Sequence, residues 1–465
     1  MKRLFILISW AGFFSILPAQ DFSPVIHKIV PNVVDIRSLG MGKTGSAGNV
    51  GSNAIFGNPS LIALQQNASI KLGSILNLTY LNDEYTDKYN ELSDYKVKHG
   101  YKPNYKFSHI SAAFPFHIDK SSVPFSFAFG AGYHNAIDLS STRYLNENSI
   151  TLSDFYQHEE TDKFRGGLNT ISPAIAFGFF NRISAGVSFN IGFGNTKNEN
   201  TSATSTIISE DKIETNAVIP GNAFSTSIGI TGKLLKSLTL GANITPPYKW
   251  TWDKFEVEKK GGYPKKQKFA GGEFTIPLHF SIGCEYQLAD KFAIAFEYQT
   301  RPFESYELDA DKAATSSELS KDLSVLESII KEMNLKNGHV FHAGVELSIG
   351  YVPFRFGFFL EPYPLVSEEL KNGLRKSSEK PNNVIGGTFG FSSPISSNGM
   401  FLELAAQYGL FRSTFVDYNL SSSSSEFKEY EKKEHRLRFD LGFRIDLPSF
   451  SSNKSENTGI SAQGL

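Results

Sequence analysis

One glycine-rich motif in the sequence has the spacing of a phosphate-binding loop. Residues 40–45 read Gly-Met-Gly-Lys-Thr-Gly, which matches the G-x-G-x-x-G pattern of dinucleotide sites and ends like the loop of nucleoside triphosphatases. Such loops present backbone N–H groups to phosphate at the start of a helix. Here Arg37 stands where the triphosphatase loop needs glycine, and residues 46–59 contain many Gly, Asn and Ser residues but no acid. We therefore do not interpret the motif as a nucleotide site.

Charged residues also alternate with apolar ones. In residues 434–447, Leu437, Phe439 and Leu441 fall on one face of an extended strand, whereas Arg438 and Asp440 fall on the other. Several segments share this pattern, and their charges are expected to face inward because a charge against lipid is costly. The predicted inner face carries His279, Glu285, Glu297, His342, Glu346, Arg355, Glu403, Arg436, Arg438 and Arg444. These groups either brace one another or include an arginine that binds a ligand carboxylate.

The sequence offers no catalytic or metal-binding pattern. His279 and His342 have no accompanying nucleophile motif, and the ten histidines lack metal-ligand spacing. Cys284 is the only cysteine, so we expect neither a disulfide framework nor a cysteine-ligated zinc. The 46 Lys and Arg against 47 Asp and Glu give no electrostatic reason for a nucleic-acid partner. We predict a protein that is not an enzyme and has no cofactor.

Period-two alternation predicts an all-β chain. Most expected strands reach the ~9–11 residues that a tilted transmembrane strand needs, and their even number suits a bacterial barrel. Long and short connections alternate, as for external loops and periplasmic turns. We predict an antiparallel transmembrane β-barrel of fourteen strands at 68–80, 106–116, 123–136, 169–180, 182–193, 222–232, 237–247, 276–287, 291–301, 338–350, 353–360, 383–392, 399–412 and 434–447. The long loops are expected at 81–105, 137–168, 194–221, 248–275, 302–337, 361–382 and 413–433.

The start of the chain is typical of an export signal. Lys2 and Arg3 precede an apolar run over residues 4–16, and Leu-Pro-Ala at 17–19 offers a cleavage point. We therefore assign residues 1–19 to a signal peptide and expect the mature protein in the bacterial outer membrane. Within 302–337 a capping box (Thr315 and Glu318) and an apolar stripe predict a surface helix. Some aromatic residues near strand ends could form interfacial girdles or could equally be ordinary packing: Tyr80, Tyr133, Trp250, Trp252, Tyr286, Tyr298 and Tyr408.

The segment before the first strand resembles the FadL/TodX family of outer-membrane transporters for long-chain fatty acids and aromatic hydrocarbons. The similarity lies in Gly-Met-Gly-Lys-Thr-Gly-Ser-Ala-Gly at 40–48, Asn-Ala at 53–54 and Gly-Asn-Pro-Ser-Leu at 57–61. Ser60 replaces the usual alanine of the family, and the glycine that normally follows is absent. The resemblance implies an N-terminal hatch inside the lumen (20–66), a fourteen-stranded barrel (67–450) and a C-terminal tail (451–465).

The resemblance also implies a function, namely passive transport of fatty acids or hydrocarbons with lateral exit through the barrel wall. Asn58 and Pro59 would then shape the turn into the first strand. Gly130 and Gly132 share the inner face of one strand and would either allow the lateral opening or contact the hatch closely. Arg355 and Arg438 become candidates for binding the ligand carboxylate. The alternative function is an accessory or shuttle component of protein secretion.

The expected partners are a hydrophobic small molecule, outer-membrane lipids and, during biogenesis, the barrel-assembly machinery. We expect the protein to be a monomer.

Overall fold

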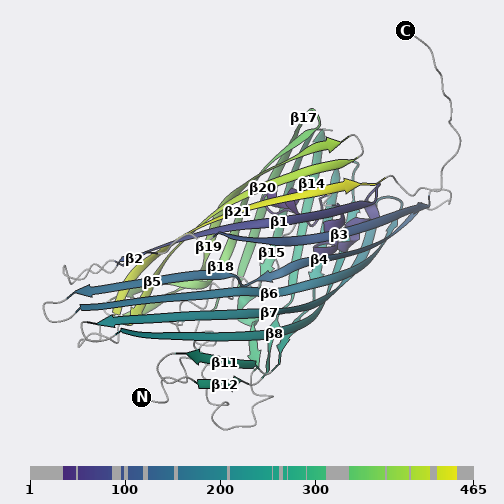
Figure 1. Ribbon diagram of the computed structural model, residues 1–465. Coiled ribbons are helices and arrows are strands. Elements are labelled where there is room, and N and C mark those ends of the chain that lie inside the picture. Colours follow the sequence, from purple (N-terminus) through teal and green to yellow (C-terminus); the bar gives the residue numbers. More distant parts are fainter. Residues whose placement is uncertain are drawn as a thin grey trace, which may run out of the picture.

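A computed structural model describes most of the chain between residues 35 and 447 (Figure 1). The described ranges are 35–48, 51–85, 96–98, 103–118, 124–150, 155–206, 210–253, 255–260, 265–269, 271–289, 291–309, 335–371, 374–396, 399–418 and 427–447. The predicted signal peptide, the C-terminal tail and the helix expected within 302–337 lie outside them. Within these ranges, no helix has the length and apolar character needed to cross a membrane.

Fourteen antiparallel strands form a closed barrel, as the sequence predicts. Each barrel strand pairs with the next, and the last strand pairs with the first over residues 69–85 and 430–446, which closes the sheet. The barrel strands are β1 (Ser69–Tyr85), β3 (Asn104–Ile118), β4 (Phe125–Asp138), β6 (Phe155–Phe179), β7 (Ile183–Thr206), β8 (Glu210–Lys233), β9 (Leu238–Thr245), β14 (His279–Ala289), β15 (Phe292–Arg301), β17 (Gly338–Ile349), β18 (Val352–Lys371), β19 (Leu374–Ser396), β20 (Met400–Tyr418) and β21 (Phe427–Asp446).

The predicted loops were wrong in their extent, because several strands continue far past the expected membrane boundary. The range 194–221 was expected to be a loop, yet β7 and β8 remain paired from Ile183 and Gly232 out to Ser205 and Glu210. Shorter strands extend the same side of the barrel: β2 (Lys96–Lys98), β5 (Ser141–Ile150), β10 (Tyr248–Trp252), β11 (Phe255–Lys260), β12 (Lys265–Phe269), β13 (Gly272–Ile276) and β16 (Glu307–Asp309). Figure 1 shows β5, β6, β7 and β8 running side by side well beyond the neighbouring strands.

The opposite end has tight turns. Phe180, Asn181 and Arg182 connect β6 to β7, and Phe180 and Asn181 have φ angles of 55° and 53°. Positive φ at both central residues of a turn is typical of the type I′ geometry that suits twisted strands. We refer below to the turn end and the loop end of the barrel.

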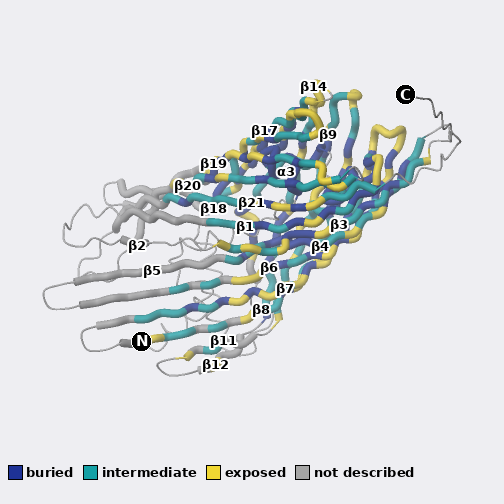
Figure 2. Tube along the Cα trace, turned by 45° about the horizontal axis from the view of Figure 1, so that its top comes forward, coloured by how far each residue is buried: buried dark blue, intermediate teal, exposed yellow. Residues whose placement is uncertain are grey.

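Burial alternates along the strands as the sequence predicts (Figure 2). Phe129, Phe224 and Phe356 are each at least half exposed, whereas their neighbours on the other face are small or buried. An apolar outer wall on a closed barrel is the arrangement that a lipid bilayer requires, since every strand has its hydrogen bonds satisfied within the wall.

Residues 35–65, here called the N-terminal segment, lie inside the barrel. They contain α3 (Ile36–Gly40), η2 (Gly51–Phe56) and η3 (Pro59–Leu64). These short helices contact strands from all around the wall, including β1, β4, β7, β8, β18 and β20. A segment that touches opposite walls of a closed barrel can lie only in its interior, and Figure 2 shows α3 enclosed by the strands.

Candidate functional site

Asp35 connects the start of the N-terminal segment to a buried group of charged residues on the barrel wall. Asp35 caps α3 by accepting a hydrogen bond from the Ser38 amide at 2.8 Å. Its other oxygen lies 2.7 Å from the Lys71 ammonium on β1, and Lys71 lies 3.5 Å from Glu403 on β20. Arg444 on β21 completes the group with a 3.1 Å ion pair to Glu403. Charges so deeply buried require partners of this kind.

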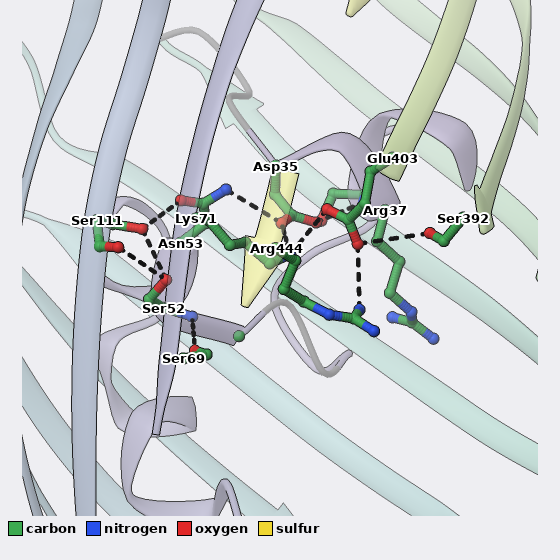
Figure 3. Close-up of polar contacts among 12 residues, drawn as sticks. Asp35, Arg37, Ser52, Asn53, Ser69, Lys71, Ser111, Ser392, Glu403 and Arg444 are labelled. Carbon is green, nitrogen blue, oxygen red and sulfur yellow. Dashed lines mark hydrogen bonds and ion pairs between the residues drawn. The ribbon is translucent and has the colours of Figure 1, made fainter. Parts of the chain in front are cut away.

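Arg37 makes the second connection, on the opposite side of α3. Its guanidinium donates hydrogen bonds to Glu285 at 3.0 Å and to Glu346 at 3.1 Å. Glu346 in turn accepts from Arg355 at 2.6 Å, and Arg355 also donates to Ser392 at 2.7 Å. Because Ser392 donates a hydrogen bond to Glu403 at 3.4 Å, the two groups join into one network. Figure 3 shows the part of it formed by Asp35, Lys71, Glu403, Arg444 and Ser392. We call these residues the ion-pair network.

The ion-pair network shifts the pKa values of Asp35 and Arg37 in the N-terminal segment. Burial raises the pKa of the Asp35 carboxyl, but the Lys71 ammonium outweighs it, and the net pKa falls below 3.8. For Arg37 burial lowers the pKa, yet the carboxylates of Glu285 and Glu346 raise it overall. Both side chains are therefore charged at neutral pH, and both hold the segment to the wall electrostatically.

The glycine-rich motif binds a carboxylate of the protein itself. The backbone N–H groups of Gly45 and Ser46 donate to Glu297 on β15 at 2.7 and 2.8 Å. Gly42 has a φ of 70°, and a Cβ there would collide with backbone oxygens of β17 and β18, so only glycine fits. The amides that resemble a phosphate loop are thus already occupied, which agrees with our rejection of a nucleotide site.

Lys43, in the same motif, reaches toward the loop end of the lumen. Its ammonium lies 2.6 Å from Glu361 and 4.2 Å from the centre of the Phe359 ring. Burial lowers the pKa of this ammonium, and Glu361 opposes the shift. Lys43 therefore places a desolvated cation beside an aromatic surface.

Asn58 and Pro59 begin the last helix of the N-terminal segment, η3, which precedes the first strand. Asn58 caps η3 by accepting from the Ser60 amide at 3.2 Å, and Pro59 occupies the first position of that helix. The Asn58 amide also donates to the Ser46 carbonyl at 2.6 Å and to Thr231 on β8 at 3.0 Å. These contacts tie the two halves of the segment together and to the wall.

Gly130 and Gly132 contact the N-terminal segment closely. A Cβ at Gly130 would lie 2.7 Å from Ile55, and one at Gly132 would lie 2.5 Å from Phe56. Strand β4 remains paired with both β3 and β6 across these glycines, and the nearest irregularity is at Asn135. Of the two explanations given by the sequence, the structure shows the close contact; a lateral opening stays a prediction.

The two candidate arginines are both paired with acids of the wall. Arg355 contacts Glu346, as described above. Arg438 makes a two-point contact with Asp440, with distances of 2.8 and 2.7 Å. This arrangement is the internally braced network that the sequence allowed as one alternative.

A buried apolar cluster fills the loop end of the lumen. It combines residues from the interior of β6, β18, β19 and β20 with residues of strand ends and connecting segments, and Phe303, Phe359 and Phe411 are almost completely inaccessible to solvent. Trp250 and Trp252 pack against it, so for these two aromatic residues the structure shows ordinary packing rather than a place in an interfacial girdle. The cluster, here called the apolar cluster, consists of Ala136, Ile137, Leu139, Leu168, Phe274, Ile276, Phe303, Tyr306, Leu335, Phe359, Tyr363, Val384 and Phe411.

The architecture is that of outer-membrane β-barrels with an occupied lumen. No protein-family model and no curated protein matches the sequence. Among solved structures, the chain is similar to a FadL homologue of Pseudomonas aeruginosa, with a TM-score of 0.56 and 10% identity over 89% of this chain and 98% of that one. It is also similar to the toluene transporter TodX of P. putida (TM-score 0.52, 12% identity, 89% and 98% coverage).

A third similar structure is the CymD monoaromatic hydrocarbon channel (TM-score 0.50, 13% identity, 89% and 97% coverage). At these identities the likeness establishes the fold. The FadL/TodX resemblance predicted from residues 40–61 is therefore confirmed as a shared fold, and none of the three similar structures is named as an enzyme.

Proposed function

We propose that the protein is a passive channel for hydrophobic small molecules, such as fatty acids or hydrocarbons, across the outer membrane. The observation that carries this proposal is the apolar cluster. A water-filled pore has a polar lumen, whereas here Phe303, Phe359 and Phe411 bury their side chains inside the barrel at the end that faces the loops. An apolar molecule entering from that end would replace aromatic contacts with equivalent ones at little cost.

Polar groups around the apolar cluster suit a ligand with an oxygen atom at one end. Within the described chain, the indole N–H groups of Trp250 and Trp252 are buried without an acceptor. Unsatisfied buried donors are costly, so an acceptor supplied by a ligand would stabilise them. The Lys43 ammonium lies beside Phe359 at the inner border of the cluster, where it is paired with Glu361. A fatty acid carries both an apolar chain and the acceptor.

We further propose that the ligand leaves laterally, near β4. A second apolar interface connects the N-terminal segment to this wall: Ile55 and Ile62 pack against Ala113, Ala128 and the alanines of β6. Withdrawal of the N-terminal segment would expose small apolar residues and the two glycines of β4. The ligand would then meet an apolar surface that leads toward the lipid rather than toward water.

The test is ligand binding by the purified full-length protein. Oleate binding is measured by calorimetry in detergent for the unmodified protein and for Phe303→Ala. The matched control is Phe341→Ala, because Phe341 is 51% exposed on the outer face of β17. We expect weaker oleate binding only for Phe303→Ala, by about ten-fold or more, since removing the apolar contact area of a Phe side chain costs about 1.5–3 kcal/mol and 1.4 kcal/mol is ten-fold in affinity. Equal binding by all three proteins would contradict the proposal.

The secretion alternative is tested on the protein as it is isolated from its own membrane. Native mass spectrometry with lipid analysis distinguishes the two functions. Retained fatty acid or hydrocarbon supports the channel, whereas a stoichiometric exported protein bound to an otherwise empty barrel would support the accessory role.

A further inference from the structure

Two basic residues, here called the cationic pair, lie at the turn end of the barrel where β7 meets β8. Arg182 directly precedes β7, and Lys233 is the last residue of β8. The Lys233 amide donates to the Arg182 carbonyl at 2.7 Å, so the two residues are cross-strand neighbours. Arg182 is exposed and Lys233 is half-buried. A third basic residue, Lys236, is exposed in the connection between β8 and β9.

The sequence around the cationic pair contains no acid that could neutralise it. Residues 163–198 and 215–252, which include the turn-end parts of β6 to β9, have neither Asp nor Glu. Within the part of the chain that the structure describes, Arg182 and Lys233 form no ion pair. Like charges on directly opposed residues destabilise a strand pair. The cationic pair is therefore a local surplus of positive charge.

Acids of the neighbouring strands and connections do not remove this surplus. Along the row of the sheet that contains Lys233, the first acid is Glu285, two strands away on β14. Glu285 already holds Arg37 of the N-terminal segment at 3.0 Å. The adjacent turn-end connections each contribute one Asp and one Lys to the sequence, at 119–120 and 290–291, and so add no net charge.

The cationic pair lies at the height where the hydrocarbon layer ends. The outward residues of 183–193 on β7 are all apolar, and this range matches the ~9–11 residues that a tilted strand needs to cross the layer. Arg182 directly precedes this run. On β8 the apolar Ile230 is 56% exposed and lies three residues before Lys233. Short connections of bacterial barrels face the periplasm, so the adjoining head groups belong to the inner leaflet.

Exposed apolar side chains accompany the charges at this end. Phe180 is 55% exposed, and Leu234 and Leu235 are each 59% exposed. Exposed apolar groups beside polar ones are typical of surfaces that contact membranes. Long Arg and Lys side chains can leave their stems on such a surface and extend their charged ends into the head-group layer.

We propose that the cationic pair binds the phosphate of a phospholipid of the inner leaflet. The acyl chains of this lipid lie against Ile183, Ile230 and Leu234. Arg and Lys are the side chains that hold phosphate best, and an anion between them removes the repulsion of two like charges. The apolar wall beside the pair specifies that the anion is attached to acyl chains. The site does not depend on the lumen or on the proposed channel function.

Native mass spectrometry of the full-length protein in dodecyl maltoside tests this site, with dioleoyl phosphatidylglycerol as the probe. The variant is Arg182→Gln with Lys233→Gln. The matched control, Arg165→Gln with Lys163→Gln, also removes one exposed arginine and one half-buried lysine, but from the loop-end part of β6, beyond the apolar wall. Thermal unfolding confirms that each variant folds.

We expect the unmodified protein and the control to retain the lipid equally. The Arg182/Lys233 variant should bind it about ten- to thirty-fold more weakly, since each Arg or Lys beside an anionic head group contributes roughly five-fold. If the double variant does not fold, Arg182→Gln alone, with Arg165→Gln as its control, should show the roughly five-fold loss. Equal lipid retention by the variant, or an equal loss in the control, would overturn the site.

Dioleoylglycerol and inorganic phosphate separate the two parts of the ligand. Retention of dioleoylglycerol equal to that of phosphatidylglycerol would overturn the role of the phosphate. Protection against thermal unfolding by inorganic phosphate as strong as that by the lipid would overturn the role of the acyl chains. We expect neither compound to match phosphatidylglycerol.

Discussion

Replacement of Arg37 by Gln should release the N-terminal segment from the barrel wall without unfolding the barrel. Arg37 is 6% exposed and holds Glu285 and Glu346, which are acids of two different strands. Breaking a buried ion pair by removing one partner costs about 3–5 kcal/mol. Because Glu346 keeps its 2.6 Å contact with Arg355, we take the lower value, about 3 kcal/mol.

About 3 kcal/mol corresponds to a population of the released segment that is roughly 100- to 200-fold higher. Hydrogen exchange measured by mass spectrometry reports this population, since the Lys43 amide donates to the Ser38 carbonyl and the Ser46 amide to Glu297. Both amides should exchange faster by that factor, whereas amides of the β20–β21 ladder should not change.

Arg436→Gln is the matched control. Arg436 faces the lumen and pairs with Glu434 of its own strand at 2.6 Å, and no contact with the N-terminal segment is described for it. If Arg37→Gln accelerates exchange of residues 36–48 by less than two-fold, or if Arg436→Gln accelerates it equally, the ion-pair network does not hold the segment in place.

Three further perturbations test other contacts of the segment. Gly132→Val should lower the thermal midpoint, since overpacking costs about 1–3 kcal/mol, whereas Gly232→Ala should not, because nothing lies within 4 Å of that position; equal midpoints would refute the close contact. Glu297→Gln should raise the exchange rate of the Gly45 and Ser46 amides, because a hydrogen bond to a charged acceptor is worth about 1.5–3 kcal/mol; unchanged rates would argue against it. The pKa of Asp35 is below 3.8 in the folded protein, so its contribution is present above pH 3.8 and is lost as the pH falls further; exchange of residues 36–48 should therefore accelerate in that range, and Asp35→Asn should show the faster exchange already at pH 7.

The membrane part of the fold was predictable because the bilayer imposes a two-residue period. Ile171 and Phe177 are exposed, whereas Ser172 and Ala176 are buried. The residue types in a short stretch therefore indicate which side chains face the lipid and which face the lumen. The same rule fails beyond the bilayer. Residues 194–203 lie beyond the expected membrane boundary, where Asn, Thr and Lys are tolerated on either face, so the alternation disappears from the sequence although β7 and β8 remain paired.

The candidate site was predictable only on the wall side. Glu285, Glu346, Arg355 and Glu403 follow from strand alternation, but their partner Arg37 is 309 residues away from Glu346. No local pattern relates positions so far apart. The sequence does show Asp35 and Arg37 next to a stretch rich in Gly, Asn and Ser. Because an unpaired charge inside a lumen would be costly, these two residues could have been expected to pair with charges of the wall.

The length of the strands has a consequence for the surface of the cell. Strand β6 has 25 residues. At ~3.3 Å per residue and a tilt of ~45° it spans roughly 55–60 Å along the membrane normal, about twice the ~30 Å of the hydrocarbon layer. The paired ribbon of β6, β7 and β8 therefore extends about as far beyond the bilayer as it does within it. Molecules approaching the loop end of the barrel meet this ribbon before they meet the lipid.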